Sequence, residues 1–465
     1  MGRSGGIETP KLAIAGPRMS KAPAPMRSIQ EAPSDLAHAE QRRAKRLRVL
    51  LWCDYRPGTA ATISDHINAI YTLSQHEVFV YPRVGPMPEE LDLDAFDCII
   101  VHYSLALALP SYVTLRDRRR LAASRARKAA FIQDEYRFFR QTREVVIECG
   151  IDRVFTCLEP EDLGRVYGEA VVERVSFTRV LTGYVSKWLL AEEPIPLVRR
   201  SIDVGYRGRD YSAWLGSSAQ EKTEIGRRFK EDPRARSLRL DVAWQEKERL
   251  YGYRWMRFQQ RCRAVLSTET AIGRLDPDGS VAAKVETFER LASRQDRRGK
   301  LRKPSYSAVQ ARFFGGDEPP STSMQLSPRT IEAASLRTGL IMYEGSYSGF
   351  FEPWVHYLPL KKDHSNTSDV IHALRDDNRL AEVIANAYGQ VASAKGLDPA
   401  TMVREVDDWI SIGVPVADRV AHGLDLADFH QQHGFLFISN PHGLDGEPGV
   451  DALVARMARR LARLF

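Results

Sequence analysis

The sequence predicts an α/β protein with two doubly wound, Rossmann-like halves that face each other across a cleft. Short, continuously apolar runs alternate with amphipathic helical segments, and this series occurs on both sides of a proline-containing stretch at 191–200. Continuous apolar runs are typical of parallel strands that are covered on both faces. The length of 465 residues suits two or three domains.

The first half is expected over residues 46–190. Apolar runs predict its strands at 49–53, 76–81, 98–102, 128–133 and 153–157. Residues 62–73 predict a helix, because Ile63, Ile67 and Ile70 recur at helical spacing. The preceding residues 1–45 are rich in Pro, Ala, Ser and Gly, which predicts a disordered tail.

The second half is expected over residues 201–447, after a linker at 191–200. Strands are predicted at 202–206, 264–267 and 339–343, and helices at 219–229, 330–336 and 376–388. A charged segment at 276–320 interrupts this series and is interpreted as an insertion. Residues 448–465 predict an amphipathic helix with arginines around an apolar face, which packs on the protein or lies on an anionic membrane.

Composition narrows the function classes. The net charge of +7 is a mild excess that permits contact with phosphates, but no nucleic-acid-binding motif accompanies it, so a nucleic-acid partner is not expected. No apolar run is long enough to cross a bilayer, and the first residues do not resemble a secretory leader. The expected location is cytoplasmic, with peripheral contact at the inner membrane face as an alternative. The 5 cysteines have scattered spacings and are expected to be reduced core residues.

Two polar residues follow predicted strands of the first half, where ligands bind in such sheets. His102 ends the run at 98–102; it either faces the cleft as a proton carrier or is a satisfied histidine at a strand end. Asp134 and Glu135 follow the run at 128–133. One of them is expected to cap the next helix, and the other to face the cleft as a general base; Glu135 is the candidate. No GxGxxG motif occurs in this half, so a dinucleotide fingerprint is absent.

The second half carries residues suited to a phosphorylated sugar. Arg209 follows a strand in the sequence Arg-Gly-Arg, and Lys222 lies on the next helix; both could neutralise a diphosphate. Glu269 ends another strand between two threonines, a setting that suits sugar hydroxyls.

A helix start in the same half adds further candidates. Ser327 fits the N-cap and Pro328 the first helical position, so the free N–H groups and Arg329 could bind phosphate oxygens. Glu332, one turn into this helix, could reach ribose hydroxyls. The alternative is an ordinary capped helix on a basic surface.

One motif suggests a metal site but is interpreted otherwise. Asp276-Pro277-Asp278 matches the DxD pattern of metal-dependent sugar transfer, but Pro-Asp-Gly is a strong turn signal, and the turn is favoured. No metal or other cofactor is therefore expected.

Several strings resemble the two-domain (GT-B) glycosyltransferases, in particular a bacterial branch described as CgeB-like or family-1-type. They are FIQDEYR (131–137), VLTGYV (180–185), VGYRGR (204–209), ERLYGYRW (248–255) and SPRTIEAASLRTGLIMYEGSYSGFFEPWVHYLPLKKD (327–363). The resemblance implies that residues 46–190 form the acceptor-side domain and residues 201–447 the donor domain. It also implies that Arg209 and Lys222 neutralise the leaving diphosphate, and that Glu332 binds the donor ribose. It departs from the retaining branch at Met324, where that branch has a glutamate; Glu269 is the candidate replacement.

The expected function is therefore metal-independent transfer of a sugar from a nucleotide-sugar donor to an acceptor, as in polysaccharide biosynthesis. The sequence does not identify the acceptor, which could be a glycan, lipid, protein or small molecule, nor whether configuration is retained or inverted. The alternatives are a sugar-nucleotide epimerase of the same architecture and a scaffold that kept the fold without turnover.

Overall fold

The computed structural model describes residues 46–56, 60–295, 301–316, 321–412 and 424–435. The predicted tail at 1–45 and the predicted helix at 448–465 lie outside the described residues.

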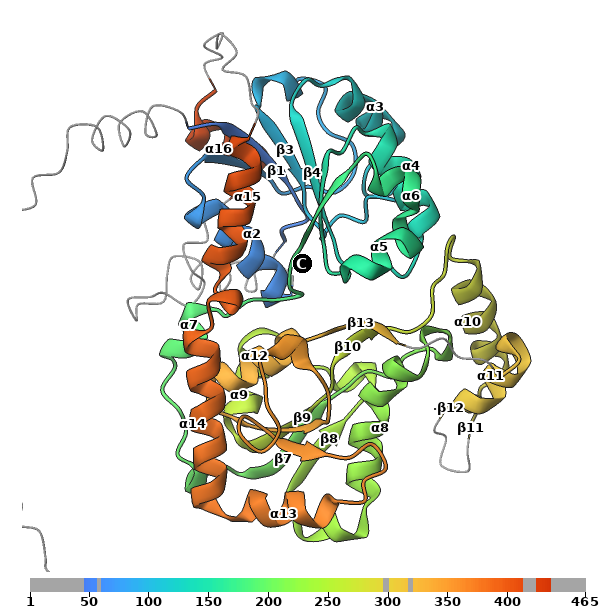
Figure 1. Cartoon of the computed structure of the whole chain (residues 1–465), viewed down its shortest axis with the longest axis vertical. Helices are drawn as coiled ribbons and strands as arrows, with labels where there is room; N and C mark the ends of the chain where they lie inside the picture. Colours follow the sequence, from blue (N-terminus) through green and yellow to red (C-terminus); the bar gives the residue numbers. More distant parts are fainter. Residues whose placement is uncertain (1–45, 57–59, 296–300, 317–320, 413–423, 436–465) are drawn as a thin grey trace, which may run out of the picture. The chain divides into compact units, whose positions relative to one another are not determined.

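The first half contains a six-stranded sheet with the order β2-β1-β3-β4-β5-β6, and all its paired strands are parallel (Figure 1). Its strands are β1 (Arg48–Trp52), β2 (Glu77–Tyr81), β3 (Cys98–Val101), β4 (Arg127–Ile132), β5 (Arg153–Thr156) and β6 (Ser176–Arg179). Its helices are α2 (Ala61–Leu73), α3 (Leu115–Ala123), α4 (Phe139–Glu148), α5 (Pro160–Tyr167), α6 (Glu169–Val172) and α7 (Lys187–Ala191).

The second half contains a five-stranded parallel sheet with the order β15-β14-β9-β7-β8. Its strands are β7 (Ile202–Arg207), β8 (Leu240–Ala243), β9 (Cys262–Ser267), β14 (Gly339–Tyr343) and β15 (Leu358–Leu360). Its helices are α8 (Ser217–Glu231), α9 (Gly252–Gln260), α12 (Pro328–Ser335), α13 (Thr367–Arg375) and α14 (Asp377–Ser393). The predicted α/β class with two doubly wound sheets is confirmed, whereas β6, β8 and β15 were not predicted.

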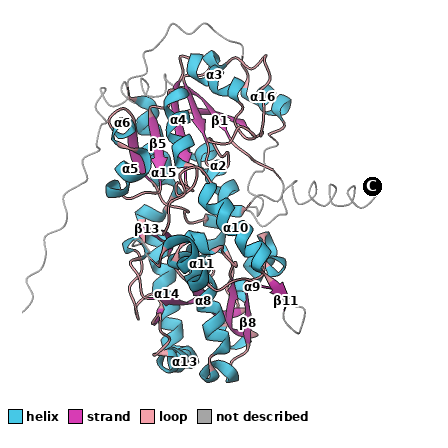
Figure 2. Cartoon of the chain, turned by 90° about the vertical axis from the view of Figure 1, so that its right-hand side faces the viewer, coloured by secondary structure: helices cyan, strands magenta, loops and turns pink. Residues whose placement is uncertain are grey.

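Each sheet is buried on both faces, which explains why its central strands are continuously apolar. In β1, Leu50 and Trp52 pack into one core cluster of the first half, and Val49 and Leu51 into the cluster on the opposite face. This alternation follows from the two-residue period of a strand. Figure 2 shows the helices around both sheets. All five cysteines are buried and unpaired, as predicted.

The predicted insertion at 276–320 forms a small layer of its own. It contains α10 (Ser280–Ala292), α11 (Tyr306–Phe314) and a two-stranded ribbon of β11 (Arg294–Gln295) and β12 (Leu301–Arg302). Ala282, Val285 and Val309 pack there against Trp214, which belongs to the short 3-10 helix η3 (Ala213–Leu215). A second ribbon pairs β10 (Thr270–Ile272) with β13 (Thr322–Gln325).

The chain returns to the first half after α14. Helix α15 (Pro399–Ser411) packs on α2, and α16 (Leu426–His433) packs on β2; Figure 1 shows α15 beside α2. The predicted second half, residues 201–447, includes both helices, so this boundary is corrected: α15 and α16 pack on the first half. The apolar side chains Val403, Val406 and Trp409 give the reason, because they complete the core on one face of the first sheet. Within the described ranges, no helix is long and apolar enough to cross a membrane.

Replacing Trp409 with alanine is expected to destabilise the protein by about 3 kcal/mol. Trp409 is 3% exposed, packs edge-on against Phe155 and donates from Nε1 to Asp152 at 3.0 Å. Urea unfolding followed by circular dichroism measures the change. Ile412→Ala is the control, because Ile412 is 66% exposed; an equal effect of both substitutions would contradict the docking of α15.

Candidate functional site

A cavity of about 360 Å³ opens where β7 and β9 end, and we call it the basic cavity. Side chains from both halves line it, among them Asp65, Trp188, Arg209, Tyr211, Lys222, Tyr251, Trp255, Ser327, Arg329 and Glu332. Five of the predicted site residues therefore lie together at the carboxyl ends of parallel strands, the usual position of a ligand in such sheets.

The two arginines that follow β7 have different environments. The guanidinium of Arg207 forms an ion pair with Asp241 at 2.8 Å, and its side chain is 12% exposed. The side chain of Arg209 is 54% exposed and lies 3.7 Å from Glu246, an equally open partner. Gly208 between them allows close packing, because a Cβ there would lie 2.9 Å from the carbonyl oxygen of Lys222. Arg209 is therefore the arginine that is available to a ligand.

Lys222 projects from α8 into the basic cavity. Its Nζ donates to the Thr270 hydroxyl at 3.3 Å, and no described carboxylate lies within ion-pair distance of it. Burial lowers the pKa of Lys222 to about 8, and the charge of Arg329 lowers it further, while Asp134 acts in the opposite direction. The cavity thus holds a half-buried ammonium group that an anionic ligand would stabilise.

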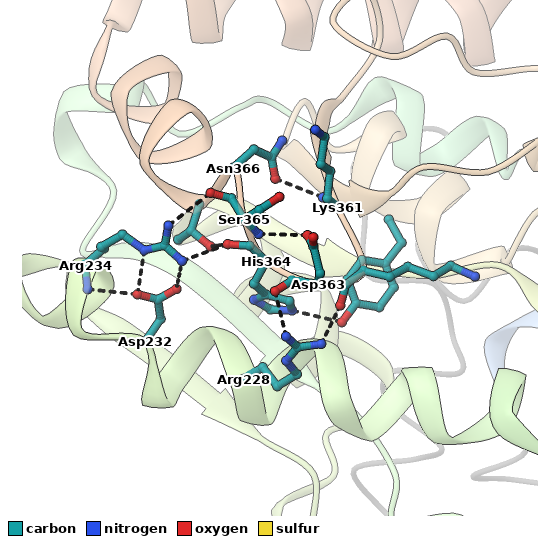
Figure 3. A network of polar contacts seen from close by, with 11 residues as sticks. Arg228, Asp232, Arg234, Lys361, Asp363, His364, Ser365 and Asn366 are labelled. Carbon is teal, nitrogen blue, oxygen red and sulfur yellow. Dashed lines mark hydrogen bonds and ion pairs between the residues drawn. The ribbon is translucent and has the colours of Figure 1, made fainter.

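A network of polar contacts holds α8 in place (Figure 3). Arg228, near the end of α8, donates from Nη2 to the carbonyl oxygen of Asp363 at 2.7 Å. Arg234 donates to the carbonyl oxygen of His364 at 2.7 Å. Both acceptors belong to the loop that follows β15, so the loop binds α8 and the segment after it. This anchorage fixes the helix that carries Lys222 relative to the edge of the sheet.

The start of α12 borders the same cavity. Ser327 occupies the N-cap and Pro328 the first turn, as predicted, although the Ser327 side chain makes no capping hydrogen bond. The guanidinium of Arg329 donates to the carbonyl oxygen of Arg207 and lies 5.3 Å from the centre of the Trp255 ring. A helix start carries partial positive charge, so it adds to the charge of the arginine.

Two carboxyl groups line the cavity and interact electrostatically. Glu332 accepts a hydrogen bond from the Trp255 indole at 2.7 Å, and burial raises its pKa to about 7. Asp65, on α2, accepts from the Ser186 hydroxyl, and burial raises its pKa to about 6. The charge of Asp65 also raises the pKa of Glu332. Each group can therefore exchange a proton near neutral pH.

Glu269 does not line the basic cavity, which corrects the expectation that it contacts a sugar. Its Oε1 accepts from the backbone N–H of Tyr347 at 2.6 Å and from the Ser346 hydroxyl at 2.9 Å. The side chain points away from the cavity and holds the loop after β14. Its neighbours Thr268 and Thr270 line the cavity instead.

His102 also departs from the expectation that it faces the cleft. Its side chain is 0% exposed, and its ring nitrogens contact His66 Nδ1 at 3.0 Å and Ser104 Oγ at 2.9 Å. Burial holds the pKa of His102 well below its usual range. The structure agrees with the alternative, a neutral histidine satisfied at a strand end.

Glu135 does not face the cleft, which corrects its assignment as the candidate base. Glu135 is 3% exposed and accepts hydrogen bonds from the hydroxyls of Thr156 and Tyr167, so it lies in the core and burial raises its pKa to about 8. Neither carboxylate caps α4, whose N-cap residue is Phe138. Asp134, instead, is open to a second cavity.

This second cavity has a volume of about 1030 Å³, and we call it the aromatic cavity. Its walls include Tyr103, Tyr112, Asp134, Tyr136, Phe138 and Trp214. It shares Thr62, Arg209 and Tyr211 with the basic cavity, so the two cavities adjoin. Burial raises the pKa of Asp134, while a hydrogen bond with Tyr136 and the charge of Lys222 oppose this shift.

The Asp-Pro-Asp-Gly sequence forms the predicted turn. Asp276 is 0% exposed and accepts from the backbone N–H groups of Gly279 at 3.0 Å and Ala282 at 3.0 Å. It therefore caps α10. In the described part of the chain, no group of three or more His, Cys, Asp or Glu side chains is arranged to hold a metal ion.

The basic cavity is also lined by Asp65, Trp188 and Trp255, which the sequence did not predict as site residues. Asp65 occupies a polar position on the predicted helix at 62–73, where a carboxylate looks like part of a solvated face. Trp255 was noted only within the string ERLYGYRW. The available signal was the closeness of aromatic residues and arginines within this string. In the structure, Arg249 stacks on Tyr251, and Arg329, from α12, stacks on Trp255.

No family model and no curated protein matches the chain. Among solved structures, it is similar to a DNA-modifying beta-glucosyltransferase solved with and without uridine diphosphoglucose, over 78% of this chain and 99% of that one, with 10% identity and a TM-score of 0.48. It is also similar to HepE of Anabaena in complex with UDP-glucose (79% and 100% covered, 12% identity, TM-score 0.41) and to TarM (70% and 56% covered, 11% identity, TM-score 0.40). At these values, the likenesses assign neither an activity nor a ligand to this chain.

Replacing Glu332 with glutamine is expected to flatten the pH dependence of stability. The pKa of Glu332 is raised to about 7 in the folded chain, so the folded state binds a proton more tightly than the unfolded state. Stability from this group is present below pH 4.5 and is lost as pH rises to about 7. The free energy of unfolding of Glu332→Gln, relative to that of the parent chain, should therefore be higher at pH 8 than at pH 5. The expected change is on the order of 2 kcal/mol.

Urea unfolding of both proteins at the two pH values tests this expectation. Glu382→Gln, at an exposed position on α14, is the matched control. If the free energies of unfolding of Glu332→Gln and the parent chain differ by the same amount at pH 5 and pH 8, the assigned environment of this carboxyl group is wrong.

Proposed function

We propose that this chain is a glycosyltransferase of the two-domain (GT-B) class that its sequence resembles, and that the basic cavity binds the nucleotide-sugar donor. The observation that carries the proposal is the positive charge of Arg209, Lys222 and Arg329 around one cavity, next to the start of α12.

Charge explains why a diphosphate suits this cavity. The leaving nucleoside diphosphate gains negative charge as the bond to the sugar breaks. Lys222 and Arg329 are held in advance by the contacts of α8 and by the carbonyl oxygen of Arg207, so they need little rearrangement. Preorganised donors of this kind stabilise a transition state by several kcal/mol in a site that excludes water. Arg209 is open enough to move onto a phosphate.

The remaining wall suits a nucleoside. In the proposed complex, Glu332 accepts hydrogen bonds from the ribose hydroxyls, the role that the sequence resemblance implies. The rings of Tyr251 and Trp255 offer flat surfaces to a base. The donor sugar would then lie beyond the phosphates, toward Arg209 and Tyr211, where the aromatic cavity begins.

Titration calorimetry with UDP-, GDP-, ADP- and TDP-sugars tests the proposal. We expect one nucleotide class to bind, and its affinity to fall about tenfold to hundredfold in Lys222→Met, because a charge-assisted hydrogen bond contributes about 1.5–3 kcal/mol. Arg209→Ala and Glu332→Ala should also weaken binding.

Arg227→Ala is the matched control for these variants. Arg227 lies on the same helix as Lys222, but its guanidinium pairs with Glu224 and Glu231 at the surface. No binding by any donor in a folded sample would contradict the proposal and favour a scaffold. Conversion of the donor into an epimer, with no transfer and no free sugar, would identify an epimerase.

Donor binding is expected to be independent of divalent metal ions, because side chains supply the positive charge in the proposed complex. The affinity for the identified donor should be the same after dialysis against EDTA as in buffer with Mg²⁺ or Mn²⁺. A rise of about tenfold or more on adding either ion would show that the cations of the cavity are insufficient.

A further inference from the structure

We propose that the aromatic cavity receives a carbohydrate acceptor, and that Asp134 takes the proton from its attacking hydroxyl, so that transfer inverts the configuration of the sugar. This inference rests on the proposed donor site in the basic cavity. It assigns a use to the cavity between the first sheet and the insertion at 276–320.

The position of the cavity is the first argument. The two cavities share Arg209 and Tyr211, so an acceptor in one lies next to the phosphate end of a donor in the other. The aromatic cavity has about three times the volume of the basic cavity, 1030 Å³ against 360 Å³. It can therefore hold a ligand larger than a single donor sugar.

The rings that line the cavity indicate the class of acceptor. Tyr103, Tyr112, Tyr136 and Phe138 are only partly buried, and each borders the cavity. Flat rings pack well against the C–H faces of pyranoses, and tyrosine hydroxyls can pair with sugar hydroxyls. Trp214 is fixed by its indole N–H, which donates to Glu286 of α10 at 3.0 Å.

Unpaired polar groups point to the same class. The Ser212 hydroxyl and the Nε of Arg137 are buried at the cavity wall without a hydrogen-bond partner among the described residues. Buried polar atoms usually have a partner, and the hydroxyls of a sugar can supply one.

The charge of the cavity wall disfavours a polyanion as the acceptor. The basic side chains are Arg137, Arg209, Arg290 and Lys303, and an equal number of carboxylates lies among them. Nucleic-acid sites carry a clear excess of positive charge, so a neutral acceptor fits better.

Asp134 is placed to act as the base. It follows β4, is open to the aromatic cavity and interacts electrostatically with Lys222 of the basic cavity. A carboxylate there can accept the proton of the acceptor hydroxyl while the oxygen bonds to the anomeric carbon. The bond from that carbon to the diphosphate breaks at the same time, and its electron pair stays on the diphosphate oxygen. One displacement of this kind inverts the configuration.

Hydrolysis of the identified donor tests the role of Asp134, with water as the acceptor. We expect Asp134→Asn to lower kcat by about 100-fold or more, since a general base contributes roughly 10²–10⁴-fold. The donor should still bind, with a Kd no higher than that of the parent chain, because the substitution removes a negative charge near the diphosphate. Nuclear magnetic resonance should show the inverted anomer as the first product. Asp408→Asn, at an exposed position on α15, is the matched control and should retain the parent rate.

The outcomes separate this inference from the proposed function. Failure of every donor to bind would reject both. A donor that binds and is hydrolysed at an unchanged rate by Asp134→Asn, or with retained configuration, would overturn only the role of Asp134.

Binding to an array of neutral oligosaccharides, with the donor nucleoside diphosphate present, tests the acceptor class. We expect members of the array to bind, and the signal to fall about tenfold or more in Tyr112→Ala but not in Tyr253→Ala, since Tyr253 is 60% exposed outside the cavity. The carbohydrate assignment would be overturned if no member of the array bound, or if both variants bound equally well. It would also be overturned if, in a transfer assay, the protein used dodecanol, a lipid-like alcohol, in preference to every sugar.

Discussion

The arrangement of the candidate site depends on the charge of Lys222, which has no ion-pair partner among the residues that the structure describes. Lys222 has a hydroxyl as its hydrogen-bond partner, and burial lowers the pKa of its ammonium group to about 8. Holding such a group half-buried without a counter-charge costs free energy unless a ligand compensates for it. The close packing at Gly208 and the contacts of α8 with the loop after β15 keep the lysine in this position. The fold therefore maintains an environment that favours an anion.

Much of the fold could be predicted because both sheets are covered on both faces. Strands buried in this way are continuously apolar, so the runs at 49–53, 98–102 and 339–343 mark β1, β3 and β14 directly. Edge strands gave a weaker signal: β6 is partly exposed along its length and was missed. The grouping of Lys222, Arg329 and Glu332 could also be predicted, because the carboxyl ends of parallel strands meet at one edge of a sheet.

Side-chain direction at the strand ends could not be predicted with the same success. Successive residues of an extended chain point to opposite sides, so an error of one position exchanges a buried side chain for an exposed one. Asp134 and Glu135 illustrate this, since Asp134 faces a cavity and Glu135 lies in the core. Glu269 shows the same effect, because it points away from the basic cavity while its neighbours Thr268 and Thr270 line it. The aromatic cavity was missed for another reason, because its walls come from segments far apart in sequence, including α10 of the insertion.

The two cavities are coupled by charge in the proposed reaction. In the structure, Asp134 and Lys222 attract each other, which lowers the pKa of the carboxyl group and raises that of the ammonium group. A bound diphosphate would share the charge of Lys222 and bring its own negative charge closer to Asp134. Both effects raise the proton affinity of Asp134, and a carboxylate of higher pKa is a stronger base as long as it stays ionised. Donor binding would therefore prepare the base for the acceptor, and this order follows from the electrostatic interaction of Lys222 with Asp134.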